Sequence, residues 1–201
     1  MKMKRILDVG CGKEKVKVKG AKVIGIDRIE LPGVDVIHDL EKTPLPFPDN
    51  YFDEIICNHV LEHINNLFNL MEEFYRIIKP NGLLKIRVPY FASPSAFMHP
   101  DHKRFFTYKT FDYWLPNEKQ RYEVSRNASF IYKERKLIFD KKFRVFRLDI
   151  IANSFPNFYE VILSRIFPAG DIYRADSIKI NNEEKNSKCR LWDRNLWNSF
   201  C

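Results

Sequence analysis

Two glycines stand at the end of a short apolar run near the start of the chain. The stretch ILDVGCGKEK places Gly10 and Gly12 directly after the apolar residues 5–9. A strand that enters a glycine turn is typical of a loop beneath a nucleotide cofactor, but the dinucleotide fingerprint requires a further glycine where this chain has Lys15. The turn therefore indicates a cofactor loop and leaves the nature of the cofactor open.

Acidic residues close the next two apolar runs. Asp27 ends the run VIGID, where an acid at the end of a second strand accepts hydrogen bonds from ribose hydroxyls. Asp39 follows the third run, where its carboxylate can accept from an adenine amino group while Leu40 covers the ring. Because ligands of open α/β sheets lie across the carboxyl ends of the strands, these groups together predict an adenosine-containing ligand. The alternative is that both acids only cap turns.

The elements that must position these groups begin with five short runs rich in Ile, Val and Leu. The apolar character of each run is largely continuous rather than alternating, which suits strands of a parallel sheet covered on both faces. Strands are predicted over residues 5–9, 22–26, 34–38, 52–57 and 83–88.

One long amphipathic helix is predicted between the fourth and fifth strands. Apolar residues recur at three- and four-residue spacing from Leu61 to Ile78, which makes one face apolar over about five turns. Pro80, Asn81 and Gly82 end the pattern. The helix and the strand after it therefore form a crossover between parallel strands, and such crossovers are right-handed.

Beyond Ser129 the pattern changes. The segments FIYKERKLIF and KFRVFRLDII predict two strands joined by a polar turn at residues 140–142, which together make an antiparallel hairpin. Further helices are predicted over residues 107–115 and over the segment FPNFYEVILSRIF, the second one packed on the sheet. One domain over residues 1–180 and a polar tail over residues 181–201 are expected.

The composition limits the function. The 201 residues include 34 Lys and Arg against 26 Asp and Glu, a net charge of +8, but basic and acidic residues are interleaved, which indicates a solvated surface more than a nucleic-acid footprint. Four cysteines show neither a CxxC pair nor zinc spacing. No apolar run approaches the ~18 residues that cross a bilayer. A cytoplasmic protein with free thiols and no membrane partner is predicted, and the oligomeric state stays open.

Four segments, taken in order, resemble the class I S-adenosylmethionine-dependent methyltransferases, specifically the type-11 methyltransferase domain and its short archaeal and bacterial branch. They are ILDVGCGK, VIGIDRIE, DVIHDLEKTPLPFPDNYFDEIICNHVLEHI and IIKPNGLLKIRVPY, and the resemblance covers most of residues 4–180. It implies an α/β, Rossmann-like, doubly wound and mostly parallel sheet, with S-adenosyl-L-methionine as the cofactor. This cofactor has no phosphate to cradle, so the family's loop does not need the third glycine.

The resemblance also implies the cofactor-binding residues. They are Asp8, Gly10, Cys11 and Gly12 around the methionine portion, Asp27 and Arg28 at the ribose, Asp39 and Leu40 at the adenine, and Asn58, His59 and His63 at and after the end of the fourth strand.

The chain departs from the family's pattern after the glycine turn. Only fourteen residues separate Gly12 from Asp27, whereas a crossover with its helix usually takes at least ~10 to 12 residues in addition to the strand. The first crossover helix is therefore expected to be short or absent.

The acceptor side is predicted in the segment HPDHKRFFT, which follows the fifth strand. His99, Asp101 and His102 fall within four residues there and are the candidate catalytic residues, as a base or as substrate contacts. Structural hydrogen bonding and a metal are the alternatives. Since the spacing does not force the three side chains onto one centre and no fourth ligand is evident, no metal site is predicted. The segment is expected to form a lid over the acceptor.

The predicted function is methyl transfer to a small-molecule or sugar-like acceptor. The fourth strand ends in Cys57, Asn58 and His59, without the Asn-Pro-Pro-Tyr or Asp-Pro-Pro-Tyr sequence associated with base amines, which disfavours base methylation of nucleic acid. The first alternative is a cofactor-binding module without activity, whose acceptor space aromatic side chains would fill. The second is an RNA methyltransferase, which would gather basic residues on the acceptor rim. The candidates for that rim are Lys103, Arg104, Arg121, Arg126, Lys133 and Arg135.

Overall fold

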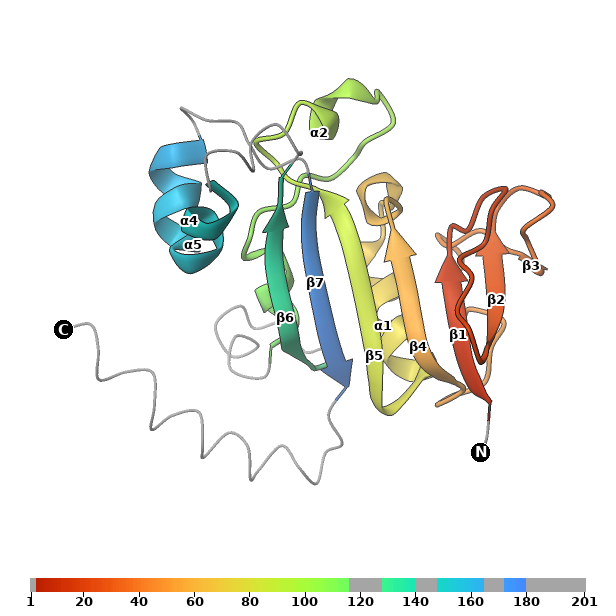
Figure 1. Ribbon diagram of the computed structural model, residues 1–201. Coiled ribbons are helices and arrows are strands. Elements are labelled where there is room, and N and C mark those ends of the chain that lie inside the picture. The colour runs from red at the N-terminus through yellow and green to blue at the C-terminus, as the bar shows by residue number, and fades with distance from the viewer. Residues whose placement is uncertain (1–2, 116–127, 140–147, 165–171, 180–201) are drawn as a thin grey trace.

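A seven-stranded sheet forms the centre of the molecule (Figure 1), with strand order β3-β2-β1-β4-β5-β7-β6. The computed structural model describes residues 3–115, 128–139, 148–164 and 172–179. The strands are β1 (Lys4–Val9), β2 (Ala21–Asp27), β3 (Val36–Ile37), β4 (Phe52–Asn58), β5 (Ile78–Pro89), β6 (Phe130–Ile138) and β7 (Ile172–Lys179). Neighbours from β3 to β5 are parallel, and β7 is antiparallel to both β5 and β6. The predicted Rossmann-like, mostly parallel sheet is confirmed.

The strand register brings the predicted cofactor residues to one edge of the sheet. Val9 of β1 lies opposite Ile26 of β2 and Cys57 of β4. Because the chain leaves these three parallel strands at the same edge, Gly10 and Asp27 emerge side by side. The start of the site is thus set by the sheet itself.

The first crossover contains no helix. Residues 10–20 pass from β1 to β2 as turns and extended chain, as expected from the short spacing. Polar side chains hold this loop in place: Asp8 accepts a hydrogen bond from the backbone N–H of Val16 at 2.8 Å, and Nζ of Lys15 lies 2.5 Å from Oδ2 of Asp35, which follows β2.

The amphipathic helix is shorter than predicted. The residues Leu61–His63 form a single 3-10 turn, η1, after which Ile64 is extended, and the α-helix α1 covers Leu67–Ile77. Its apolar face is buried against the sheet through Leu67, Leu70, Met71, Phe74 and Ile77. Pro80, Asn81 and Gly82 lie within β5, where the pairing with β4 shifts register and Asn81 has a φ of +61°. The Pro-Asn-Gly sequence is therefore a strand irregularity, not the end of the helix.

The predicted hairpin is half right. The first strand is β6, but its antiparallel partner is β7, and residues 140–147 lie outside the described part of the chain. Residues Leu148–Ser154 form the helix α4 instead of a strand. This helix is fixed to the edge of β6 by Asn153, whose amide accepts from the N–H of Leu137 at 2.8 Å and donates to its carbonyl at 3.0 Å.

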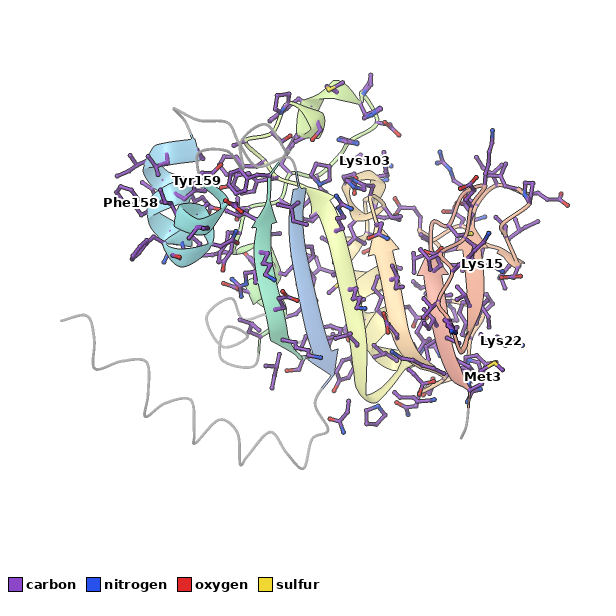
Figure 2. The ribbon with its side chains drawn as sticks, viewed as in Figure 1. Met3, Lys15, Lys22, Lys103, Phe158 and Tyr159 are labelled. Carbon is purple, nitrogen blue, oxygen red and sulfur yellow. The ribbon has the colours of Figure 1, made fainter. Side chains whose placement is uncertain are left out.

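Short helices complete the described structure. Ser95–Met98 form α2, above the carboxyl ends of the strands in Figure 1, and Thr110–Trp114 form the 3-10 helix η2 inside the predicted helix 107–115. The predicted helix near residue 160 consists of α5 (Pro156–Phe158) and the π-helical turn η4 (Tyr159–Leu163). Tyr159 is buried, whereas Phe158 is exposed (Figure 2). None of the described helices is long and apolar enough to span a bilayer, and the expected tail 181–201 lies outside the described residues.

Candidate active site

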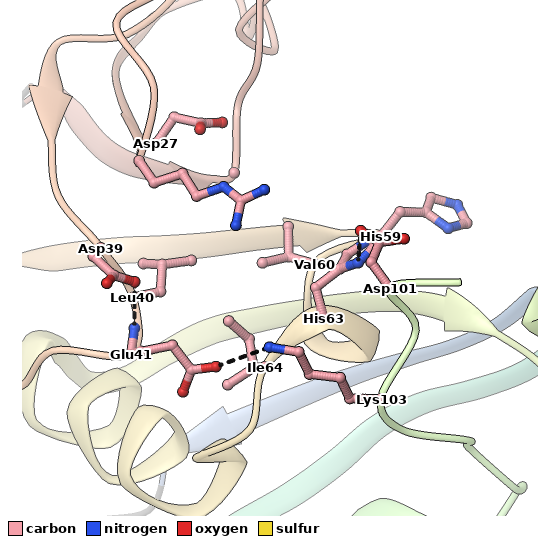
Figure 3. Close-up of a pocket in the computed structure, with 12 residues that line it drawn as sticks. Asp27, Asp39, Leu40, Glu41, His59, Val60, His63, Ile64, Asp101 and Lys103 are labelled. Atoms are coloured by element: carbon pink, nitrogen blue, oxygen red, sulfur yellow. Dashed lines mark hydrogen bonds and ion pairs between the residues drawn. The ribbon is translucent and has the colours of Figure 1, made fainter. Parts of the chain in front are cut away.

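A pocket of about 230 Å³ lies at the carboxyl ends of the parallel strands (Figure 3). It is lined by Gly10, Asp27, Arg28, Asp39, Leu40, Glu41, His59, Val60, His63, Ile64, Asp101 and Lys103. Seven residues of the predicted cofactor set and one predicted catalytic residue, Asp101, are among them. The groups that follow β1, β2, β3 and β4 thus meet in one place.

The glycine turn approaches its neighbours too closely for a side chain. Gly10 has a φ of +63°, and a Cβ atom there would lie 2.4 Å from Cγ2 of Val60. Its N–H donates to the carbonyl of Ile26 at 2.8 Å. Gly12 has a φ of +58°, and its N–H donates to Oδ2 of Asp27 at 3.0 Å. The turn is therefore tied to the end of β2, and the acid predicted for the ribose is part of the same unit.

The two strand-end acids keep acceptor capacity toward the pocket. Oδ1 of Asp27 accepts from the N–H of Ile29 at 3.2 Å, and Oδ1 of Asp39 accepts from the N–H of Glu41 at 3.1 Å. An ionised carboxylate has about four lone-pair sites, so both can accept further bonds from a ligand. Leu40 is buried beside Asp39 and supplies an apolar wall.

Two predicted cofactor residues lie beneath the loop instead of lining the pocket. Asp8 is buried, and this burial raises the pKa of its carboxyl against the opposing effects of the Val16 N–H and of Lys15. The thiol of Cys11 lies 3.5 Å from the carbonyl of Gly33, and burial, followed by the charges of Asp8 and Asp27, raises its pKa to about 11. Both residues shape the loop. Asn58 is exposed and is not among the lining residues.

The chain turns sharply after β4. His59 adopts a φ of +53°, and its N–H donates to the carbonyl of Arg87 in β5 at 2.8 Å. Histidine is one of the residue types that tolerate this left-handed conformation. His59 lines the pocket, and Nδ1 of its ring lies 3.4 Å from Oε1 of Glu62.

The segment with the predicted catalytic residues packs against η1. The backbone N–H groups of Lys103 and Arg104 donate to the carbonyl of Glu62 at 2.7 and 3.2 Å, and Nε of Arg104 donates to the carbonyl of Ile64 at 2.7 Å. This attachment sets Asp101 beside His63 at the pocket wall, as Figure 3 shows.

The three predicted catalytic residues take different positions. Oδ2 of Asp101 lies 2.9 Å from Nδ1 of His63, within ion-pair distance but without the alignment of a hydrogen bond. The ring of His102 lies 4.8 Å from that of His63 and 5.1 Å from that of His99, measured between centroids. Neither His99 nor His102 lines the pocket. The acceptor segment therefore borders the pocket through Asp101 and Lys103.

Four residues that line the pocket were not predicted from the sequence: Glu41, Val60, Ile64 and Lys103. Glu41 forms an ion pair with Lys103 at 3.7 Å, and its carboxylate accepts from the N–H groups of Asn65 and Asn66 at 2.6 and 3.0 Å. It thereby joins the loop after β3 to the start of α1. The position of Glu41 directly after Asp39 and Leu40 could have indicated a pocket residue. Its hydrogen-bond and ion-pair partners could not be predicted, because Asn65, Asn66 and Lys103 lie far from it in the sequence.

Of the six residues predicted for a basic rim, Lys103 alone lines this pocket within the described part of the chain. Lys103 pairs with Glu41, and Nη2 of Arg135 lies 2.6 Å from Oδ1 of Asp112. Lys133 lines a hollow with Met3, which lies at the opposite end of the sheet from Lys103 (Figure 2). Arg121 and Arg126 lie outside the described residues.

Comparison with known proteins gives a family match over more than half of the chain. Residues 2–130 match the family model described as a methyltransferase domain. Among curated proteins, the ubiquinone biosynthesis O-methyltransferase of Dechloromonas aromatica (strain RCB) is 35% identical over 97 residues, which cover 39% of this chain and 41% of that protein. The enzyme of the same name from Pseudomonas putida (strain W619) is 34% identical over 97 residues, with the same coverage. The chain thus matches less than half the length of these relatives.

Solved structures share the fold at low sequence identity. A methyltransferase from Archaeoglobus fulgidus described as S-adenosylmethionine-dependent has a TM-score of 0.53 at 20% identity, covering 88% of this chain and 86% of its own. A protein of the same description from Mesorhizobium loti has a TM-score of 0.56 at 14% identity, covering 87% and 90%. A putative methyltransferase in complex with the Trm112 activator of Haloferax volcanii has a TM-score of 0.55 at 12% identity, covering 89% and 84%.

Proposed function

The chain belongs to the methyltransferase domain family, whose cofactor is S-adenosylmethionine, and on that premise we propose that it methylates a hydroxyl group of a small molecule. The observation that carries the proposal is the convergence of Gly10, Asp27, Asp39 and His59 on one pocket. The first three of these residues offer close backbone approach for the methionine portion, an acceptor for the ribose and an acceptor for the adenine, in the order of these groups along S-adenosylmethionine. His59 adds an imidazole to the same pocket.

Methyl transfer is an in-line displacement. The acceptor oxygen forms a bond to the methyl carbon while the carbon–sulfur bond breaks, and its electron pair stays on the sulfur, which becomes a neutral thioether. The tasks of the protein are to align the two reactants and to exclude water. An imidazole within hydrogen-bond reach of the acceptor hydroxyl can take its proton, and His59 and His63 both line the pocket.

The nature of the acceptor rests on two supports. The relatives from Dechloromonas and Pseudomonas carry the name of O-methyltransferases of ubiquinone biosynthesis, which indicates a small hydroxylated acceptor. The pocket wall near His63 is polar, since Oδ2 of Asp101 lies 2.9 Å from Nδ1 of that histidine. A filling of aromatic side chains, expected for a cofactor-binding module without activity, is not seen among the described lining residues. No described basic cluster favours RNA, and the cytoplasmic location stays a prediction.

Calorimetry tests the cofactor assignment. Wild-type protein is titrated with S-adenosylmethionine and S-adenosylhomocysteine, and Asp27→Ala is compared with Glu30→Ala, an exposed acid three positions further along the same loop. Loss of the ribose acceptor is expected to weaken binding at least about 10-fold, the equivalent of about 1.4 kcal/mol, whereas Glu30→Ala leaves it unchanged. Binding that is absent at millimolar ligand, or that is equal in both variants, would show the assignment to be wrong.

A screen of acceptors tests the reaction. Production of S-adenosylhomocysteine is followed with pools of phenolic, catecholic and sugar-like hydroxyl compounds. Turnover with one hydroxyl class is expected. Tight cofactor binding with no turnover on any pool would favour the non-catalytic module.

A further inference from the structure

Three potential metal ligands meet beside the proposed acceptor end of the pocket. Single ligand atoms of Glu62, His63 and His102 all lie within 4.8 Å of one another. Glu62 and His63 come from η1, and His102 comes from the segment after α2. They converge because the carbonyl of Glu62 accepts two backbone hydrogen bonds from Lys103 and Arg104, which follow His102 directly.

The carboxylate of Glu62 is buried with one oxygen unsatisfied. Its side chain is 2% exposed, and within the described part of the chain Oε2 has no hydrogen-bond partner. The other oxygen, Oε1, lies 3.4 Å from Nδ1 of His59, which is a long contact. A buried carboxylate oxygen without a partner carries a desolvation cost of a few kcal/mol, and a bound cation removes that cost.

The ring of His102 is oriented by a hydrogen bond of the kind that orients metal-ligating histidines. Nδ1 of His102 lies 3.0 Å from the carbonyl of Ala96, and since a carbonyl can only accept, Nδ1 carries the proton of the neutral ring. Nε2 of His102 therefore keeps a lone pair. Metal-ligating histidines usually donate their second ring N–H to a carbonyl or carboxylate in this way. The carboxylate of Asp101 lies 2.9 Å from Nδ1 of His63 and can take the same role after a small rotation that aligns the two groups.

We propose that Glu62, His63 and His102 bind one divalent transition-metal cation such as Mn²⁺. Two imidazoles and one carboxylate suit such ions and leave coordination positions open. Ligand atoms about 2.1 Å from one ion lie at most about 4.2 Å apart, so a small closure of the three side chains from the observed spread completes the site. No metal site was predicted from the sequence, because His102 was considered together with its neighbours His99 and Asp101. Its proximity to Glu62 and His63 of η1 is visible only in the structure.

The role of the cation rests on the proposed function. His63 both lines the pocket and belongs to the ligand set, so a cation bound by this set would lie at the pocket wall, within reach of an acceptor. A hydroxyl bound there releases its proton to water more readily, because the cation stabilises the oxyanion. The oxyanion then attacks the methyl carbon, and the electron pair of the broken bond stays on sulfur. The acceptor class is a hydroxyl compound that can coordinate a metal through oxygen.

Direct metal binding is the test. Protein without an affinity tag is freed of metal with EDTA, dialysed, and titrated with Mn²⁺ while the electron paramagnetic resonance of the free ion is recorded. We expect saturable binding of one ion per chain. His102→Ala and Glu62→Gln should each weaken it by more than about 100-fold, and Asp101→Asn, which removes an outer partner, by about 10-fold. His38→Ala, at the end of β3, is the matched histidine control and should bind normally.

Each outcome decides the proposal. No binding at millimolar Mn²⁺, or wild-type affinity in both His102→Ala and Glu62→Gln, overturns it. Circular dichroism establishes whether each variant is folded, and if the buried Glu62→Gln is not, the partly exposed His102→Ala decides. Calorimetry with S-adenosylmethionine on the metal-free protein tests cofactor binding independently of the metal site. If Mn²⁺ binds but no methyl transfer occurs, the metal site stands and the proposed function fails. If methyl transfer persists in EDTA and Mn²⁺ does not bind, the proposed function stands and the metal site fails.

Discussion

The backbone N–H of Gly12 donates a hydrogen bond to Oδ2 of Asp27 at 3.0 Å. The glycine turn after β1 and the acid at the end of β2 are therefore one structural unit. In a chain whose first crossover has no helix, this bond and the one from Val16 to Asp8 take over the task of fixing the loop. Substitutions in the turn should consequently alter both stability and cofactor affinity.

Gly10→Ala tests the closeness of the turn to η1. The new Cβ would lie 2.4 Å from Cγ2 of Val60 at a φ of +63°, so overpacking adds to backbone strain and the expected loss is about 2 to 4 kcal/mol of unfolding free energy. Gly20→Ala is the matched control: its φ is +76°, but nothing lies within 4 Å of the added atom, so it should lose only about 1 kcal/mol. Urea unfolding measures both. Equal losses would show that contact with Val60 is unimportant.

Much of the fold follows from local pattern. The strands β1, β2, β4 and β5 each contain a short run rich in Ile, Val and Leu, so their prediction needed no knowledge of partners. The start of α1 could not be predicted from the local pattern. Leu61 and Ile64 keep the spacing of a helix, but Leu61 lies in the 3-10 turn η1 and Ile64 is extended, and α1 begins only at Leu67. Periodicity records which side chains are buried. It does not distinguish a long helix from a 3-10 turn followed by a shorter one.

Contacts between segments far apart in the sequence were harder to predict. The second strand of the hairpin was placed on branched apolar residues near Leu148, which are typical of strands, but these residues form α4, whose Asn153 satisfies the edge of β6. At the site, Asp27 and Asp39 were accessible to prediction because parallel strands end at one edge. The meeting of Glu62 with His102 was not, since it depends on backbone hydrogen bonds between segments far apart in the chain.

Cys11 should be an unreactive thiol. Its pKa of about 11, raised by burial and then by Asp8 and Asp27, predicts alkylation by iodoacetamide at pH 8 about 100-fold slower than for a free cysteine. Asp27→Asn removes one of the negative charges and should accelerate the reaction, whereas Asp39→Asn should not. Mass spectrometry of the peptide that contains Cys11 gives the rates. Alkylation at the rate of a free cysteine in the wild type would contradict the raised pKa of the Cys11 thiol.

Glu41 should stabilise the start of α1. Its carboxylate accepts from the N–H groups of Asn65 and Asn66, at the end of the helix where negative charge is favourable. Glu41→Gln is expected to cost about 1 to 2 kcal/mol of unfolding free energy, as the loss of a helix cap does, and to speed amide exchange in the first turn after Leu67. Glu30→Gln, an exposed acid, serves as the control. Unchanged exchange near Leu67 would mean that Glu41 acts only through its ion pair with Lys103.

Glu54 makes the stability of the sheet dependent on pH. Its side chain is 5% exposed, and its two oxygens lie 2.5 Å from Nζ of Lys4 and 2.7 Å from Nζ of Lys85. Burial alone would raise the pKa of this carboxyl, but the hydrogen bonds and charges of the two lysines lower it below its usual value. Because the folded-state pKa lies below that of the unfolded chain, the ionised form stabilises the fold. That contribution is complete above the unfolded pKa of about 4.3 and is lost as pH falls through the folded value.

Glu54→Gln is therefore expected to unfold more easily at neutral pH, by about 2 kcal/mol, and to lose less further stability on acidification. Urea unfolding of wild type and variant at steps from about pH 7 to about pH 3 measures the difference between them, which should shrink below about pH 4. Glu14→Gln, an exposed acid in the loop after the glycine turn, should track the wild type throughout. A difference between Glu54→Gln and wild type that stays constant down to about pH 3 would show that the loss is one of packing, not of the charged pairs with Lys4 and Lys85.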